Sequence, residues 1–184
     1  MWNFSWVSTW GSTAEERAAS YPCDGLIDRP AVIAFRAVSV AAPKELVFRW
    51  LCQLRTAPYS YDWIDNFGRQ SPRQLTEGLE RLEIGQRFMR IFRLASYEQG
   101  SSITLESCTV LFGHVAGCYR VTGTEANHSR LVAKLTLVPP PGLRGQVIRH
   151  ILPAGDVVMM RRQLLALKSL AERDAVMVAT SDPR

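Results

Sequence analysis

The hydrophobic and polar positions near the carboxyl end predict a long amphipathic helix over residues 155–175. At 100° per residue, one arc of this helix is apolar and the opposite arc is strongly basic. The apolar arc holds Met159, Met160, Leu164, Leu167, Leu170 and Ala171. Asp156 is expected to cap the first turn, because Gly155 and Pro153 end any helix that arrives from upstream. The apolar side needs a cover, which we expect the preceding chain to supply.

Period-two alternation upstream predicts a run of antiparallel strands. They are expected at 31–40, 86–94, 102–107, 115–124 and 129–138, with a further short strand in 96–99 or 108–112. Turn residues at 98–101 and 125–128 predict hairpins between neighbouring strands. Arg36 has the parity of the inward-facing Val38, so we expect it near a strand end or reaching past the core. A run of strands followed by a helix is typical of an α+β domain.

Two further helices are predicted ahead of the sheet and after its first strand. Pro43 is suited to begin a helix over 43–54, and Ser12 or Thr13 is suited to cap a short helix. Residues 22–25, Pro-Cys-Asp-Gly, form a predicted turn, and residues 69–85 have the composition of a loop.

The amino-terminal segment is rich in large aromatic residues that are costly to leave in water. They are Trp2, Phe4, Trp6 and Trp10. We therefore expect residues 1–30 to form an arm that packs on a single domain over 31–178, or on a partner subunit, with 179–184 as a tail. A homodimer is one open possibility.

Composition indicates an ordinary globular protein, with 47% hydrophobic and 21% charged residues among 184. No apolar run is long enough to span a bilayer, and the first residues lack a signal-peptide pattern, so we expect a cytoplasmic location. The net charge of +5 is spread along the chain. The basic pair Arg161-Arg162 is interpreted as a solvated helix face, with an anionic lipid head group or RNA as alternatives. We expect no nucleic acid partner.

The residue types that commonly bind metals, cysteine and histidine, do not occur at the spacings of known metal or cofactor motifs. Cys23, Cys52, Cys108 and Cys118 lack CxxC spacing and are expected to be free thiols used as small buried hydrophobes. The histidines His114, His128 and His150 stand apart from one another. There is no phosphate-binding glycine loop, no Gly-x-Ser-x-Gly and no zinc signature, so we assign no metal site and no cofactor.

Four pieces of the sequence resemble a group of bacterial proteins in the SRPBCC superfamily, which includes START lipid-transfer domains, polyketide cyclases and the birch pollen allergen. The pieces are 10–16, Ala42-Pro43 ahead of Val47 and Trp50-Leu51, 59–66 (Tyr-Ser-Tyr-Asp-Trp-Ile-Asp-Asn) and 155–162. The resemblance implies a helix-grip fold, in which a curved antiparallel sheet wraps around a long carboxy-terminal helix. Two departures concern the cavity mouth: Cys23 stands where glycine is expected, and segment 108–116 is longer and more hydrophobic than usual.

If that helix closes a cavity, its expected lining combines large apolar side chains with a few polar groups, as suits a small hydrophobic ligand. The lining would be Tyr59, Tyr61, Trp63, Tyr119, Val121, Met160, Gln163, Leu164 and Leu167. Gln163 lies within the apolar arc and needs a hydrogen bond from a side chain, a water or a ligand. The alternative is that these residues fill a solid core.

Three functions remain open at this point. The first is binding of a small hydrophobic or lipid-like molecule without chemistry. The second is a polyketide cyclase- or dehydratase-like enzyme, with Asp62 or Asp65 as acid/base and Tyr59 or Tyr61 as hydrogen-bond donors. The two carboxylates can equally cap turns around Trp63. The third is a protein-interaction domain that uses the amino-terminal arm.

Overall fold

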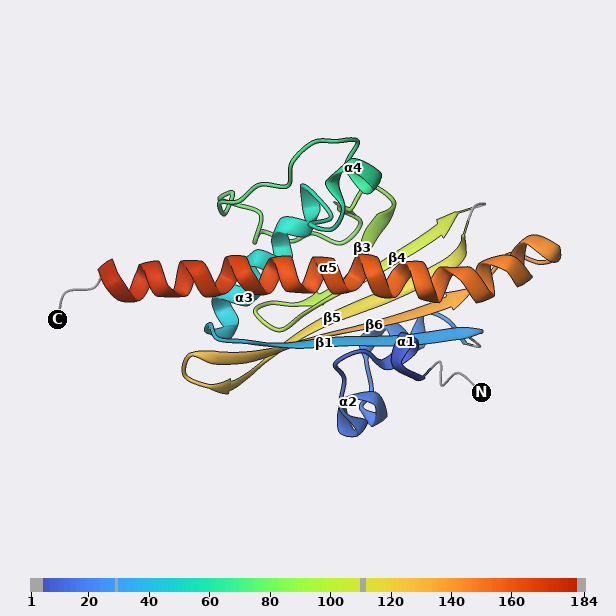
Figure 1. Cartoon of the computed structure of the whole chain (residues 1–184), viewed down its shortest axis with the longest axis horizontal. Helices are drawn as coiled ribbons and strands as arrows, with labels where there is room; N and C mark the ends of the chain where they lie inside the picture. Colours follow the sequence, from blue (N-terminus) through green and yellow to red (C-terminus); the bar gives the residue numbers. More distant parts are fainter. Residues whose placement is uncertain (1–4, 29, 110–111, 182–184) are drawn as a thin grey trace.

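The chain folds into one antiparallel sheet gripped against a long carboxy-terminal helix (Figure 1). The computed structural model describes residues 5–28, 30–109 and 112–181. Within them the strands are β1 (Val32–Val40), β2 (Arg87–Phe88), β3 (Phe92–Glu98), β4 (Ser102–Thr109), β5 (Gly113–Glu125) and β6 (His128–Val138). Their order across the sheet is β1-β6-β5-β4-β3-β2. The expected α+β helix-grip fold is therefore confirmed.

The prediction of one strand over 86–94 is wrong, because this stretch contains a tight hairpin. Strand β2 pairs with β3 through Phe88 opposite Phe92. Met89 and Arg90 between them adopt positive φ angles of 43° and 66°. Such left-handed backbone in non-glycine residues gives no period-two signal, so the turn was invisible in the hydrophobic pattern. Residues 96–98 extend β3, and 108–109 extend β4.

The two shorter helices that the sequence predicted lie close to their expected places, and the structure adds helices over 5–9 and 62–65. The short helices are α1 (Ser5–Thr9), α2 (Ala14–Ala18), η1 (Pro22–Gly25), α3 (Lys44–Cys52), η2 (Gln53–Arg55) and α4 (Asp62–Asp65). Thr13 and Glu16 form a capping box at the start of α2: the Glu16 amide donates to Thr13 Oγ1 at 3.2 Å, and the Thr13 amide donates to Glu16 Oε2 at 2.8 Å. The 3₁₀ turn η1 replaces the simple turn expected at 22–25.

Helix α5 (Leu143–Ser181) is much longer than the predicted 155–175 and runs through both Pro153 and Gly155. The helix begins directly after Gly142, whose φ of +83° ends the preceding proline run. A proline inside a helix removes one hydrogen bond, at a cost of about 3 kcal/mol. The carbonyl of residue 149, four positions before the proline, is the group that loses its donor. Residues 149 and 154 are exposed, so water can hydrogen-bond this carbonyl. Asp156 is therefore inside the helix and does not cap it.

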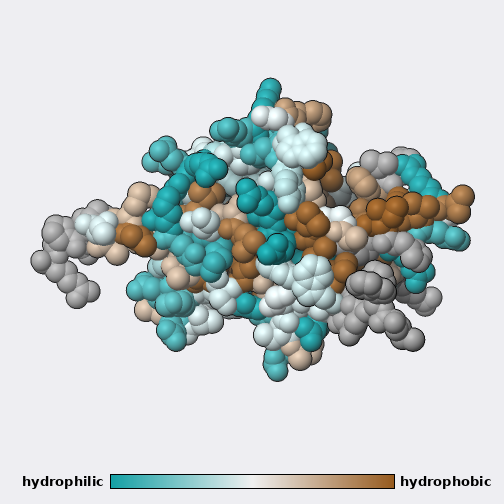
Figure 2. Space-filling view, in the orientation of Figure 1, coloured by the Kyte–Doolittle hydropathy of each residue, from teal (hydrophilic) through white to brown (hydrophobic). Residues whose placement is uncertain are grey.

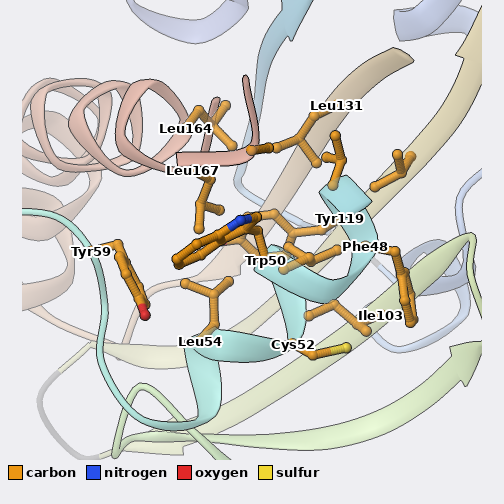
Figure 3. Packing of buried hydrophobic residues seen from close by; sticks show 14 of the residues in the cluster. Phe48, Trp50, Cys52, Leu54, Tyr59, Ile103, Tyr119, Leu131, Leu164 and Leu167 are labelled. Carbon is orange, nitrogen blue, oxygen red and sulfur yellow. The ribbon is translucent and has the colours of Figure 1, made fainter. Parts of the chain in front are cut away.

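Two apolar clusters lie on opposite faces of the sheet. The larger one fills the space between the concave face, α3 and α5, and includes Trp50, Leu164 and Leu167 (Figure 3). The smaller one covers the convex face with side chains of the amino-terminal arm, among them Tyr21 and Cys23. The strict alternation of the strands supplies both faces, because successive side chains point to opposite sides.

The amino-terminal arm is tied to the edge strand β1 and to the convex face of the sheet. The amide of Ala37 donates to the Trp10 carbonyl at 3.1 Å. Arg130 of β6 donates to Glu16 Oε1 at 2.6 Å. Trp6, expected to be covered, is 59% exposed, while Trp2 and Phe4 lie outside the described residues.

Candidate ligand cavity

A cavity of about 210 Å³ lies between α5 and the concave face of the sheet. Its apolar wall is formed by Met89, Ile91, Phe92, Leu105, Leu135, Met159 and Met160. Methionine side chains are flexible and polarizable, so they adapt to ligands of varied shape. The cavity is therefore a plausible binding space by both composition and position.

Gly117 of β5 forms part of the cavity floor and leaves it open. It shares the inward parity of Tyr119 and lies between Leu105 on β4 and Leu135 on β6. An added Cβ would lie 3.6 Å from the Lys134 carbonyl oxygen and 3.7 Å from Leu135 Cδ1, which are ordinary contacts. The backbone thus tolerates a side chain here, and the volume of that side chain would come out of the cavity.

A hydrogen-bonded chain crosses one end of the cavity. The Tyr119 hydroxyl donates to Gln163 Oε1 at 2.6 Å, and Gln163 Nε2 donates to the Pro58 carbonyl at 2.7 Å. The sulfur of Met160 lies 3.4 Å from the same hydroxyl. Burial raises the pKa of Tyr119 well above its ordinary value, so the phenol stays protonated. The Gln163 amide, which was predicted to need a hydrogen-bond partner, therefore has two: the Tyr119 hydroxyl and the Pro58 carbonyl.

An ion pair lies at another side of the cavity. Arg36 Nη2 donates to Asp156 Oδ2 at 2.9 Å, and the Asp156 carboxylate is part of the cavity wall. Burial raises the pKa of Asp156 to about 6, against the lowering effect of the Arg36 guanidinium. Burial likewise lowers the pKa of Arg36, whose Nε is buried without a hydrogen-bond partner. The cavity wall therefore includes one carboxyl group whose pKa is raised by burial.

Arg36 was expected near a strand end or reaching past the core, and the first alternative is wrong, because Arg36 lies in the middle of β1 opposite Ala133. Its side chain is 1% exposed and faces α5. A buried charge needs a counter-charge, and Asp156 of α5 provides it, because the helix begins well before this residue. The sequence pattern predicted Asp156 as a helix cap, so this pair was not expected. The signal was the inward parity of Arg36, which demanded an acidic partner on the covering helix.

The predicted lining residues separate into three groups. Tyr119, Met160 and Gln163 line the cavity. Val121, Leu164 and Leu167 are buried in the solid core beside it. Tyr59 is also in the core, where its ring meets Trp50 edge to face at 6.1 Å between centroids (Figure 3). Burial raises the pKa of Tyr59 to about 12.

The remaining predicted residues lie away from the cavity wall. Trp63 is 74% exposed on α4, and Tyr61 is half-buried outside the cavity lining. Asp62 accepts hydrogen bonds from the Ser71 amide at 2.9 Å and the Ser71 hydroxyl at 2.5 Å. This places Asp62 in the structural role of holding the loop, while the side chain of Asp65 lies outside the described part of the structure.

A second, polar cleft of about 310 Å³ lies between this loop and the outer side of α5. Its lining includes Asp62, Ser71, Arg73 and Arg162. Ser60 contributes to the wall of both this cleft and the methionine-lined cavity. Asp62 therefore faces a solvent cleft and not the apolar space.

Two of the histidines lie near a carboxylate, although the sequence showed no such spacing, and one of them, His128, has its Nδ1 3.8 Å from Glu125 Oε2. His114 Nε2 lies 2.6 Å from Glu106 Oε1 on the neighbouring strand, at the surface. Cys23, Cys52 and Cys118 are buried free thiols as expected, whereas Cys108 is exposed. Among the described residues no group of three or more His, Cys, Asp or Glu could hold a metal ion.

Comparisons with known proteins show a likeness of fold. No family model and no curated protein matches the chain. The di-domain ARO/CYC StfQ from the steffimycin biosynthetic pathway is 15% identical, with a TM-score of 0.51 over 78% of this chain and 51% of that one. The chain thus spans about half of StfQ. A protein from Thermobifida fusca is 13% identical, with a TM-score of 0.50 over 77% and 93% of the two chains.

The Zhui aromatase/cyclase from a Streptomyces species is 18% identical, with a TM-score of 0.49 over 80% of this chain and 94% of that chain. Across the residues that the structure covers, no helix is long and apolar enough to cross a membrane. The expected likeness to SRPBCC proteins is confirmed at the level of the fold: the chain has the helix-grip fold that it shares with the aromatase/cyclase StfQ.

Proposed function

We propose that this protein binds a small hydrophobic molecule in the cavity between α5 and the concave face of the sheet. The observation that carries the proposal is the cavity of about 210 Å³ with three methionines, Met89, Met159 and Met160, in its wall. A dry engineered cavity of about 150 Å³ is already large enough to take up benzene. The space therefore suits a ligand of one or two rings, or a short branched chain.

The polar groups at the cavity wall would orient such a ligand. The Tyr119 oxygen donates its proton to Gln163, which leaves a lone pair free to accept a hydrogen bond from a ligand hydroxyl. The Asp156 carboxyl is the other polar group within reach. A ligand that buries about 300 Å² of apolar surface gains roughly 7 kcal/mol of binding free energy from that burial. The costs of association reduce this gain, so micromolar binding is the tightest that we expect.

A cyclase- or dehydratase-like activity is the second candidate, and the pKa of Asp156 is the observation that favours it. A carboxyl group with a pKa of about 6 can take a proton from a carbon beside a carbonyl and return it to a departing hydroxyl. Aldol-type ring closure forms a carbon–carbon bond while the attacked carbonyl oxygen takes up the proton, and loss of water then breaks a carbon–hydrogen and a carbon–oxygen bond. Neither step needs an oxidant or a reductant, so this chemistry needs no redox partner. StfQ, which shares the fold, is named as an ARO/CYC protein. We assign this role to Asp156 in place of Asp62, and the side chain of Asp65 lies outside the described part of the structure.

Native mass spectrometry tests the binding proposal, followed by solvent extraction and identification of any released compound. We expect a stoichiometric hydrophobic adduct. A ligand-free mass, together with no thermal shift across a panel of lipids and aromatic polyketides, contradicts it. Turnover of an added substrate then separates the two candidates: the first predicts no turnover by the wild type, whereas the second predicts turnover that Asp156→Asn abolishes.

A further inference from the structure

The first half of α5 presents an apolar stripe to solvent, and this stripe is independent of the cavity. Leu143, Val147, Ile151 and Val158 are 78%, 49%, 64% and 52% exposed. At 100° per residue they fall within about 80° of one another, on the opposite side of the helix from Gln163. The core therefore cannot explain these four large side chains.

The stripe lies where α5 leaves the sheet. In Figure 1 the orange end of the helix extends beyond the tips of the strands. Figure 2 shows apolar side chains gathered along this end of α5, on the face toward the viewer. Contiguous apolar surface of this kind marks an interaction site on an otherwise ordinary monomer surface.

Charge decides which occupant fits the stripe. The sequence from 126 to 171 contains one acidic residue, Asp156, and that carboxylate is paired with the buried Arg36. The same helix carries Arg144 beside the stripe, and Arg161 and Arg162 just beyond its end. A second copy of the chain, pairing stripe to stripe across a two-fold axis, would bring these like charges together. An anionic occupant would be attracted by them.

We propose that residues 143–158 of α5 lie on the surface of a membrane that contains anionic lipids. The helix would rest in the plane of the interface, with the stripe among the acyl chains and the arginines at the phosphate level. Basic residues that flank an apolar helix face are the signature of such interfacial helices. This proposal does not depend on whether the cavity is filled.

Vesicle flotation of the full chain tests the proposal, with phosphatidylcholine alone or mixed with an equal amount of phosphatidylglycerol. We expect the protein to float with the mixed vesicles and to stay behind with phosphatidylcholine. Ile151→Asp should weaken binding by at least about tenfold, because it removes apolar contact and adds a negative charge. Arg144→Gln should weaken it by about fivefold, and added salt should weaken it further.

Val176→Asp is the matched control, since Val176 is 63% exposed near the other end of the same helix, beside Glu172 and Asp174. It should float like the wild type, and thermal melts should show that both aspartate variants remain folded. The proposal is overturned if the wild type does not float with the acidic vesicles at low salt, or if Ile151→Asp floats equally well. A dimer in solution that Ile151→Asp dissociates would also overturn it, in favour of a second copy.

Discussion

The Tyr119 hydroxyl donates a 2.6 Å hydrogen bond to Gln163 Oε1, and this bond joins the middle of β5 to the middle of α5. Gln163 passes the connection to the Pro58 carbonyl at 2.7 Å, so three distant segments meet at one buried amide. Both partners are nearly inaccessible to water. The amide therefore fixes the position and rotation of the helix over the sheet, next to the space that we assign to the ligand.

We expect Tyr119→Phe to destabilise the fold by about 1–3 kcal/mol, because it leaves the buried Gln163 oxygen without a donor. Gln163→Leu should cost a similar amount, since it removes the Gln163 amide that hydrogen-bonds both the Tyr119 hydroxyl and the Pro58 carbonyl. The double variant should cost less than the sum of the two. Urea unfolding of all four proteins measures the coupling. Strictly additive losses would mean that the hydrogen bond contributes nothing to stability.

The ion pair of Arg36 and Asp156 predicts a pH dependence of stability. The folded-state pKa of Asp156, about 6, lies above its ordinary value of 3.8, so the folded protein holds this proton more tightly than the unfolded chain does. The stabilisation is therefore complete below about pH 4 and is lost as pH rises through about 6, on the order of 2–3 kcal/mol in all.

The free energy of unfolding of wild type minus that of Asp156→Asn isolates this effect from the other carboxylates. We expect this difference to fall steadily between pH 4 and pH 7. Titration of the Asp156 carboxyl carbon by NMR gives the pKa directly. A midpoint near 4, or a stability difference that does not change with pH, would show that burial does not govern this group.

Continuity of α5 predicts opposite effects for two glycines within it. A Cβ at Gly155 would meet open space, so Gly155→Ala should stabilise the protein by about 0.5–1 kcal/mol through helix propensity. A Cβ at Gly145 would overlap the Pro140 carbonyl oxygen, so Gly145→Ala should destabilise it. Thermal unfolding of the two variants checks both signs. If Asp156 capped the first turn of the helix, as the sequence pattern suggested, Gly155→Ala would bring no gain in stability.

The strand pattern was readable from the sequence because alternating residues such as Leu131 and Ala133 meet one uniform face. The beginning of α5 was not readable, because Pro153 and Gly155 are strong local breakers and the tertiary structure overrides them. The cavity wall was predictable only in part. Met160 and Gln163 follow from helix period, but Met89 comes from a turn with positive φ, and Asp156 reaches the site only because the helix is continuous.

Ligand binding by the Gly117→Ile variant is the most direct test of the proposed cavity. Isoleucine suits a strand, its Cβ would make ordinary contacts at this position, and the rest of its side chain would occupy space that Gly117 leaves open. Gly123→Ile on the same strand is the matched control, because Gly123 faces Lys44 outside the cavity. Binding of 2-naphthol, a two-ring phenol, can be followed by its fluorescence in all three proteins. We predict binding to the wild type and to Gly123→Ile and a loss of at least about tenfold in Gly117→Ile, whose thermal unfolding should remain cooperative. Equal binding to all three proteins would contradict the assignment of the ligand to this cavity.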